Sequence, residues 1–171
     1  MLQFCRRFLL LVAFVLSLPS FALAQSADDK AMRAYTLDMA KLHKYVAAHE
    51  KLAAMIVAKP SLATIYQDKA DKEDLSMDEL VKDFDKIPEF RSVMQSQGMT
   101  TRDYLMMTFV LLHVGLYREM KKMDPRTEMP YEVSPANVRF METNAAEIQK
   151  LEARRKAAQE KIDSVAKKGK R

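Results

Sequence analysis

The feature that most constrains this chain is an apolar run of about 13 residues, Leu105 to Tyr117, which only Thr108, His113 and Gly115 interrupt. A helix that is apolar on every side is buried on every side. The run is well short of the roughly 20 residues that span a bilayer. We therefore predict a buried central helix over residues 101–122, in which Gly115 lets a neighbouring helix approach closely.

Two further long helices are expected, one before and one after this segment. Over residues 36–58 the apolar positions recur at the three-and-four spacing of a single buried stripe, and Pro60 ends the helix. The last helix is expected to begin at Pro135, after the cap residue Ser134, and to run to about residue 166. Its apolar stripe thins towards the end, so we expect that end to project into solvent or towards a partner.

Shorter helices are expected between the long ones. Ser76 with Glu79 and Thr100 with Asp103 have the spacing of capping boxes, which satisfy backbone donors at a helix start. The expected short helices span residues 60–67, a segment that begins after Ser76, and a segment from Pro88 to near Gly98.

These patterns predict an all-α fold, a helical bundle of three long helices plus two or three short ones, after an N-terminal signal peptide. The expected organisation is a signal peptide over 1–24, a flexible N-terminus over 25–34, a single helical domain over 35–166 and a disordered basic tail over 167–171.

The N-terminus has the three parts of a secretory signal peptide. Arg6 and Arg7 precede an apolar run from Phe8 to Leu18, and Ala22-Leu23-Ala24 supplies small residues at a cleavage site. The apolar run is too short for a membrane span. We expect cleavage after Ala24 and export to the periplasm or the medium, which use the same signal.

The single cysteine of the chain, Cys5, lies within the signal peptide, so the part that follows the signal contains none. Disulfides and thiolate chemistry are therefore not expected in the mature chain. Its charge is uneven: residues 150–171 carry nine basic and three acidic side chains, whereas the body before them is mildly acidic. The basic end is expected either to be a solvated helix end or to contact anionic lipid or cell-wall polymer. Nucleic acid is not expected as a partner, because no aromatic side chain is interleaved there to stack on bases.

Methionine and histidine residues suggest a metal site, but their positions also have a simpler explanation. Met120, Met123 and Met129 follow His113, and thioether sulfur suits Cu(I), while a histidine in an apolar helix could hold haem or a metal. The simpler explanation is that methionine fills a helical core and that His113 is a packed residue with one hydrogen bond. We expect no cofactor, and we retain His113, Met120 and Met123 as candidate metal ligands.

Other chemistry has little support in the sequence. His43 and His49 are six residues apart and do not share a helix face. The acidic stretch 68–89 lacks the glycine and the ligand spacing of an EF-hand. No nucleophile motif, phosphate loop or metalloprotease histidine pair is present. A helical enzyme built from scattered Arg, Lys and Glu side chains would leave no local motif.

Three short pieces together resemble a group of small exported bacterial proteins. They are Tyr35-Thr36-Leu37, Thr101-Arg102-Asp103-Tyr104 and Pro135-Ala136-Asn137-Val138. The resemblance implies a bacterial source and a helical fold. It implies no activity, and no functional residue is carried over from it.

The function favoured by elimination is a non-catalytic, exported helical protein that binds an unidentified protein or envelope component. Its partner would use the last helix or the open end of the bundle. The first alternative is a metal or haem binder that uses His113 and methionines inside the bundle. The second alternative is a helical enzyme without a sequence motif. The oligomeric state is not addressed by any of these patterns.

Overall fold

The computed structural model describes residues 26–70 and 75–168, and within these ranges it contains eight helices and no strand. The all-helical prediction is therefore confirmed for the described residues. The predicted signal peptide and residues 169–171 of the predicted tail lie outside them. The helices are α2 (Ala27–Ala34), α3 (Met39–Ala58), α4 (Ser61–Ala70), α5 (Met77–Asp85), α6 (Pro88–Ser96), α7 (Thr101–Met123), α8 (Pro135–Thr143) and α9 (Ala145–Lys168).

The helix boundaries follow the local signals that the sequence contains. Both predicted capping boxes are present: the Ser76 and Thr100 side chains accept from backbone N–H groups three residues on, and the carboxylates there bond back. Pro88 begins α6, and Gly98 follows its end with a φ of 62°, a conformation that favours glycine. Pro135 begins α8 as expected.

The segment expected to be a flexible N-terminus forms α2 instead. Ser26 makes a third capping box with Asp29, and Met32 is buried. The helix is also held from outside, because Arg33 donates to the carbonyls of Tyr131 and Val133, 2.6 Å and 3.2 Å away. The polar composition of this segment gives no sign of these contacts, because the partner residues lie about 100 positions away in the sequence.

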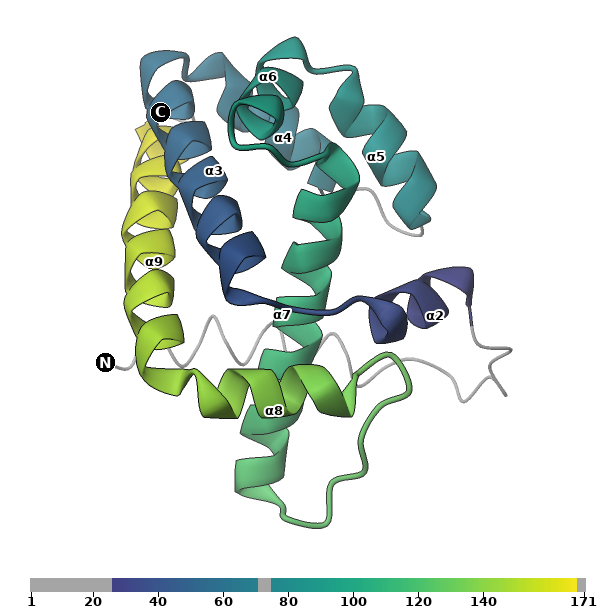
Figure 1. Cartoon of the computed structure of the whole chain (residues 1–171). Coiled ribbons are helices and arrows are strands. Elements are labelled where there is room, and N and C mark those ends of the chain that lie inside the picture. Colours follow the sequence, from purple (N-terminus) through teal and green to yellow (C-terminus); the bar gives the residue numbers. More distant parts are fainter. Residues whose placement is uncertain (1–25, 71–74, 169–171) are drawn as a thin grey trace.

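The predicted last helix is in fact two helices, which meet at Asn144. This residue leaves helical geometry at φ −105° and ψ 20°, and its side-chain amide donates to the Phe140 carbonyl. The chain turns there, so that α8 lies across α7 while α9 runs beside α3 (Figure 1). The apolar spacing is the same on both sides of the turn, so periodicity could not reveal it.

The far end of α9 packs against the protein, contrary to the expectation that it projects away. Leu151 and Ala158 are buried, and Ile162 and Val165 pack against a small cluster formed by α3 and α4. The members of this cluster are Ile56, Leu62 and Ala63. Lys167 and Lys168, expected in a disordered tail, lie within the bounds of α9.

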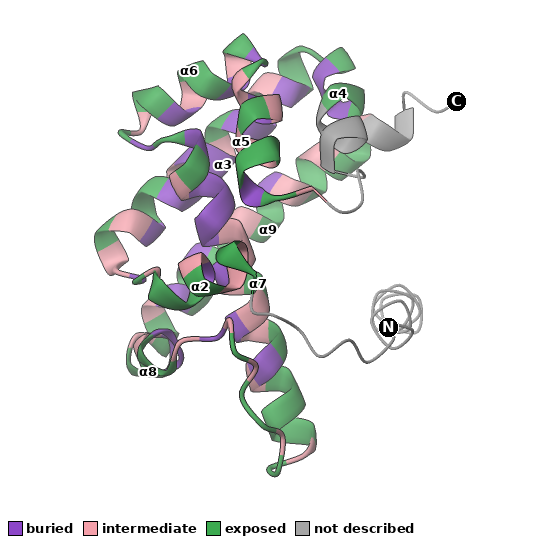
Figure 2. Ribbon diagram, turned by 90° about the vertical axis from the view of Figure 1, so that its right-hand side faces the viewer, coloured by how far each residue is buried: buried purple, intermediate pink, exposed green. Residues whose placement is uncertain are grey.

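Helix α7 is buried over only part of its length. Leu105, Met106, Met107, Val110 and Val114 are buried in the main core. Towards its C-terminal end the helix becomes exposed and extends beyond the other helices (Figures 1 and 2). The prediction that the whole run to Tyr117 is buried on every side is wrong, because Leu112 is 51% exposed and Leu116 is 38% exposed.

Asn137 of α8 joins two of the three sequence pieces singled out above. It is 1% exposed. Its side-chain oxygen accepts from the Leu37 backbone N–H at 3.0 Å, and its side-chain nitrogen donates to the Tyr35 carbonyl at 2.7 Å. This amide therefore supplies hydrogen-bond partners to backbone groups of the extended segment between α2 and α3, where no helix hydrogen bond is available.

Replacement of Asn137 by Ala should lower the free energy of unfolding by about 2–3 kcal/mol, because two hydrogen bonds are lost and the buried Leu37 N–H is left unpaired. Urea unfolding followed by circular dichroism measures the change. The control is Asn144→Ala, which removes one half-buried side-chain bond and should cost less than about 1 kcal/mol. Equal losses in the two variants would contradict the role given to Asn137.

Candidate functional site

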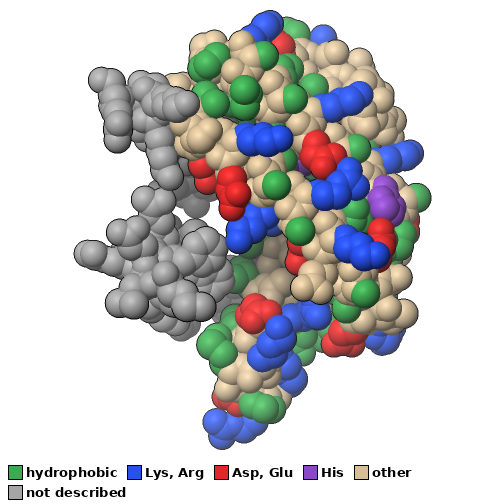
Figure 3. Space-filling model, turned by 90° about the vertical axis from the view of Figure 1, so that its left-hand side faces the viewer, with side chains coloured by type: hydrophobic (Ala, Val, Ile, Leu, Met, Phe, Trp, Pro, Cys, Tyr) green, Lys and Arg blue, Asp and Glu red, His purple; other side chains and the backbone are tan. Residues whose placement is uncertain are grey.

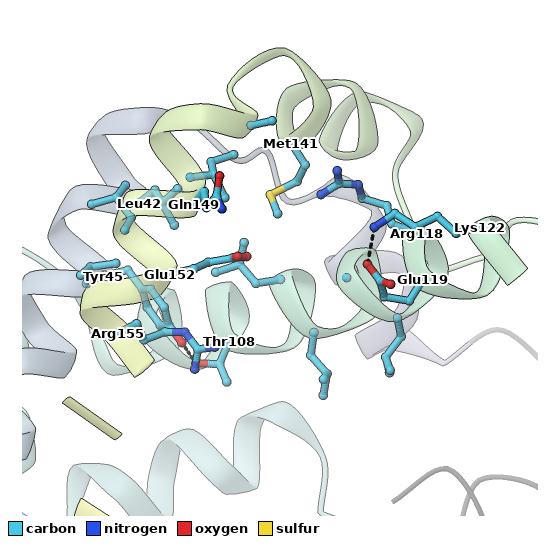
Figure 4. Close-up of a pocket in the computed structure, with 18 residues that line it drawn as sticks. Leu42, Tyr45, Thr108, Arg118, Glu119, Lys122, Met141, Gln149, Glu152 and Arg155 are labelled. Atoms are coloured by element: carbon cyan, nitrogen blue, oxygen red, sulfur yellow. Dashed lines mark hydrogen bonds and ion pairs between the residues drawn. The ribbon is translucent and has the colours of Figure 1, made fainter. Parts of the chain in front are cut away.

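A pocket of about 710 Å³ lies between α3, α7, α8 and α9 (Figure 4). Its volume falls within the roughly 300–1,000 Å³ that is typical of small-molecule sites. The side chains that line it are largely apolar: Leu42, Tyr45, Val46, Leu111, Leu112, Leu116, Met141, Ala145, Ile148 and Leu151. The pocket exists because α8 and α9 diverge at Asn144 and leave one side of α7 uncovered.

Gly115 lies in the wall of the pocket and faces open space. A Cβ atom built on it would meet no described atom within 4 Å beyond its own helix backbone and chain neighbours. The expectation that Gly115 brings a neighbouring helix close is therefore wrong. With Leu112 and Leu116 on either side, this part of α7 is an apolar surface that no described helix covers.

One end of the pocket is polar and combines Tyr45, Thr108 and Arg155 (Figure 4). The Thr108 and Tyr45 hydroxyl oxygens are 3.2 Å apart, and Thr108 also donates to the Tyr104 carbonyl at 2.9 Å. Tyr45 is 3% exposed, and its ring packs against Tyr104 with centroids 4.9 Å apart. Burial raises the pKa of Tyr45, and the Thr108 hydrogen bond and the Arg155 charge partly offset this increase.

His49 lies behind this polar end, in the core. Its Nδ1 atom is 2.8 Å from the Tyr104 hydroxyl, while its buried Nε2 atom forms no hydrogen bond with a described residue. Burial, and then the positive charge of Arg155, lower the pKa of His49 from 6.5 to about 4, although Gln159 and Glu50 act in the opposite direction. His49 is therefore neutral at physiological pH.

The pocket is lined by three cationic and two anionic side chains, Arg118, Lys122, Arg155, Glu119 and Glu152. Lys122 pairs with Glu119 at 2.7 Å. Arg118, Arg155 and Glu152 form no ion pair with another described residue. By contrast Arg154, next to Arg155 in the sequence, pairs with Glu50 at 2.7 Å on the exposed side of α9.

The structure places the candidate metal ligands on the same helix, α7, but outside the pocket. The His113 ring is partly exposed, and its Nδ1 atom lies 3.0 Å from Glu132 of the loop before α8. Met120 lies two helical turns further on, roughly 10 Å along the axis. Met123 is 79% exposed. His113 thus neither faces the cavity nor is sealed in the core.

Among the described residues, no three His, Cys, Asp or Glu side chains are grouped so as to hold a metal ion. That finding does not cover methionine sulfur. A metal site at His113, Met120 and Met123 therefore stays a prediction.

The basic character expected of the C-terminal region is balanced on the face that α3 and α9 form. Lys and Arg side chains are interspersed there with Asp and Glu side chains (Figure 3). Glu147 approaches both Lys150 at 3.6 Å and His43 at 3.8 Å, and Glu50 pairs with Arg154. The described part of α9 therefore presents mixed charge and not a continuous basic surface.

Sequence patterns did not reveal the pocket. Leu112 and Leu116 looked like core residues because they belong to one continuous apolar run. Arg155 looked like one more charge in a basic helix, and Tyr45 like a member of a buried stripe. The only available signal was that Leu105–Tyr117 is apolar around its whole circumference, which requires neighbours on every side.

Stability should decrease as the pH falls, because His49 has a lowered pKa in the folded state. The unfolded chain binds a proton at this residue below about pH 6.5, whereas the folded chain does not until about pH 4. Between pH 7 and pH 4 the loss attributable to His49 is about 3 kcal/mol. Urea unfolding of the wild type and of His49→Gln at pH 7, 5.5 and 4 should show a shallower decline in the variant. His43→Gln, on the exposed side of the same helix, should retain the wild-type decline because His49 is intact; parallel curves for wild type and His49→Gln would refute the assignment.

No helix in the described ranges combines the length and apolar character needed to cross a membrane. Comparison of the chain with protein-family models, with curated proteins and with solved structures finds no match.

Proposed function

We propose that the protein is an exported, non-catalytic binding protein, and that the pocket between α3, α7, α8 and α9 holds the apolar part of a small ligand. The observation that carries this proposal is the uncovered apolar surface of α7 at Leu112 and Leu116, which lies inside a pocket of ligand size. Apolar surface that remains in contact with water in a folded protein is unfavourable, so a ligand that covers it gains free energy.

Two further parts of the proposal rest on the sequence. Export rests on the signal-peptide pattern of residues 1–24, which lie outside the described residues. The arrangement as a helical bundle, with α3, α7 and α9 as its three long members, is supported by the pairing of α9 with α3 and by the central place of α7 (Figure 1). A bundle that is open along one side is a common setting for an interior ligand site.

A partner that docks on the last helix is less well supported by the geometry. The inner side of α9 is occupied by α3, and Leu151 and Ala158 belong to the buried core. Deletion of residues 150–171 would remove these core side chains and unfold the region. Any partner lost through such a deletion would therefore say little about a binding surface.

Catalysis stays an alternative because the same pocket contains Arg118, Glu119, Lys122, Glu152 and Arg155. Most of the pocket wall is apolar, however, and Glu119 and Lys122 are paired with each other. An apolar wall with a few polar groups fixes the orientation of a bound molecule. Binding without turnover is therefore the function that this geometry supports best.

A large side chain that enters the pocket should weaken binding without disturbing the fold. In Gly115→Phe, the ring enters the space beside Leu112 and Leu116, since a Cβ atom at position 115 meets no described atom within 4 Å. Fluorescence titration with the neutral apolar dye N-phenyl-1-naphthylamine should show saturable binding to the wild type and at least about tenfold weaker binding to the variant.

The matched control is Gly115→Ala. It should bind the dye like the wild type and should be more stable by about 1 kcal/mol, because alanine favours the helix interior. Absence of saturable dye binding to the wild type, or unchanged binding to Gly115→Phe, would overturn the proposed function.

A further inference from the structure

The polar end of the pocket contains a cation with no described counter-ion. Arg155 is partly buried and lines the pocket beside Tyr45 and Thr108 (Figure 4). It lies close enough to Tyr45 and to His49 for its charge to influence both. A guanidinium group beside apolar surface gains much more from an anionic partner than a fully hydrated one does.

No described carboxylate forms an ion pair with Arg155. On its own helix, Arg154 pairs with Glu50 of α3, so that carboxylate is already engaged. His49 of α3 is neutral at physiological pH. Glu152 also lines the pocket, and Glu119 of α7 is paired with Lys122 at the far end, where Arg118 also lies. The lining as a whole retains an excess of one positive charge.

The hydroxyl groups at this end suit an anionic acceptor. The Thr108 hydroxyl is the donor in two contacts, with the Tyr104 carbonyl at 2.9 Å and with the Tyr45 hydroxyl oxygen at 3.2 Å. Tyr45 accepts from Thr108, so its own hydroxyl proton is available to a bound group. An anion beside Arg155 would receive a second hydrogen bond from Tyr45, and the buried tyrosine would lose nothing.

We propose that the ligand is an amphiphile with a single anionic head, a carboxylate or a phosphate, which Arg155 and Tyr45 bind at the inner end of the pocket. This inference rests on the proposed function and specifies its ligand class. The apolar chain lies along Leu111, Leu112 and Leu116 of α7, towards Met141 at the other end (Figure 4). The shared requirement is one anionic group at the end of an apolar chain.

Three probes of equal chain length distinguish the contribution of the head group to affinity from that of the chain. They are dodecanoate, dodecyl phosphate and dodecanol. Each displaces N-phenyl-1-naphthylamine from the wild-type protein in a competition titration, the two anions below their critical micelle concentrations and dodecanol below its solubility limit. Dodecanoate, dodecyl phosphate or both should bind at least about tenfold more tightly than dodecanol, as expected for a charge-assisted hydrogen bond in a partly buried site. The tighter of the two anions identifies the head group.

Arg155→Met keeps the apolar stem of the side chain and removes its charge. This variant should lose about tenfold or more in affinity for the anionic probe, while its affinities for dodecanol and for the dye stay unchanged. Tyr45→Phe should lower the affinity for the anionic probe by a smaller factor and leave the affinities for dodecanol and the dye unchanged. Arg154→Met is the matched control, since its side chain pairs with Glu50 on the exposed side of α9, and it should bind all three probes like the wild type.

The possible outcomes separate this inference from the proposed function. Dye binding with equal affinity for all three probes would overturn the anionic head and leave the apolar site standing. A loss of anion affinity in Arg118→Met but not in Arg155→Met would place the head at the other end and also overturn the inference. Absence of dye binding to the wild type would overturn the proposed function itself.

Discussion

The structure depends on the partial burial of one helix, because α7 carries more apolar surface than its neighbours cover. Its first half is enclosed in the main core at Leu105, Met107 and Val110. In its second half Val114 and Tyr117 are still buried on one face, whereas Leu112 and Leu116 on another face stay accessible. Close packing around the first half stabilises the fold, whereas the uncovered second half supplies the apolar wall of the pocket.

The turn at Asn144 determines where that uncovered surface lies. Had α8 and α9 formed one straight helix, a single rod would have had to pack against both α7 and α3. The turn instead allows α8 to lie across α7 while α9 runs beside α3 (Figure 1). Asn137 holds α8 against the backbone between α2 and α3 with two hydrogen bonds. The pocket between α7 and α9 is therefore a product of helix direction, which the local hydrogen bond of Asn144 and the long-range hydrogen bonds of Asn137 maintain.

The polar end of the pocket connects the site to the core. Tyr45 and Tyr104 pack against each other, Thr108 contacts both residues, and His49 contacts the Tyr104 hydroxyl. Such a buried network is costly unless its members satisfy one another, and it therefore holds the side chains in a defined arrangement. Arg155 approaches this network from α9 and forms no ion pair with a described residue. A pocket wall held in this way is preorganised, which lowers the cost of ordering side chains around a ligand.

The amino-acid sequence by itself determined the helical class and the starts of four of the eight described helices, because capping boxes at Ser76 and Thr100 and prolines at 88 and 135 act within one turn. It also indicated the central helix through its apolar run. The tertiary structure alone decided that α2 is ordered, that the last segment turns at Asn144, and that Tyr45, Thr108 and Arg155 share one pocket. The physical reason is distance: these outcomes depend on contacts between residues up to about 100 positions apart, and local periodicity states which face of a helix is apolar but not whether another helix covers it.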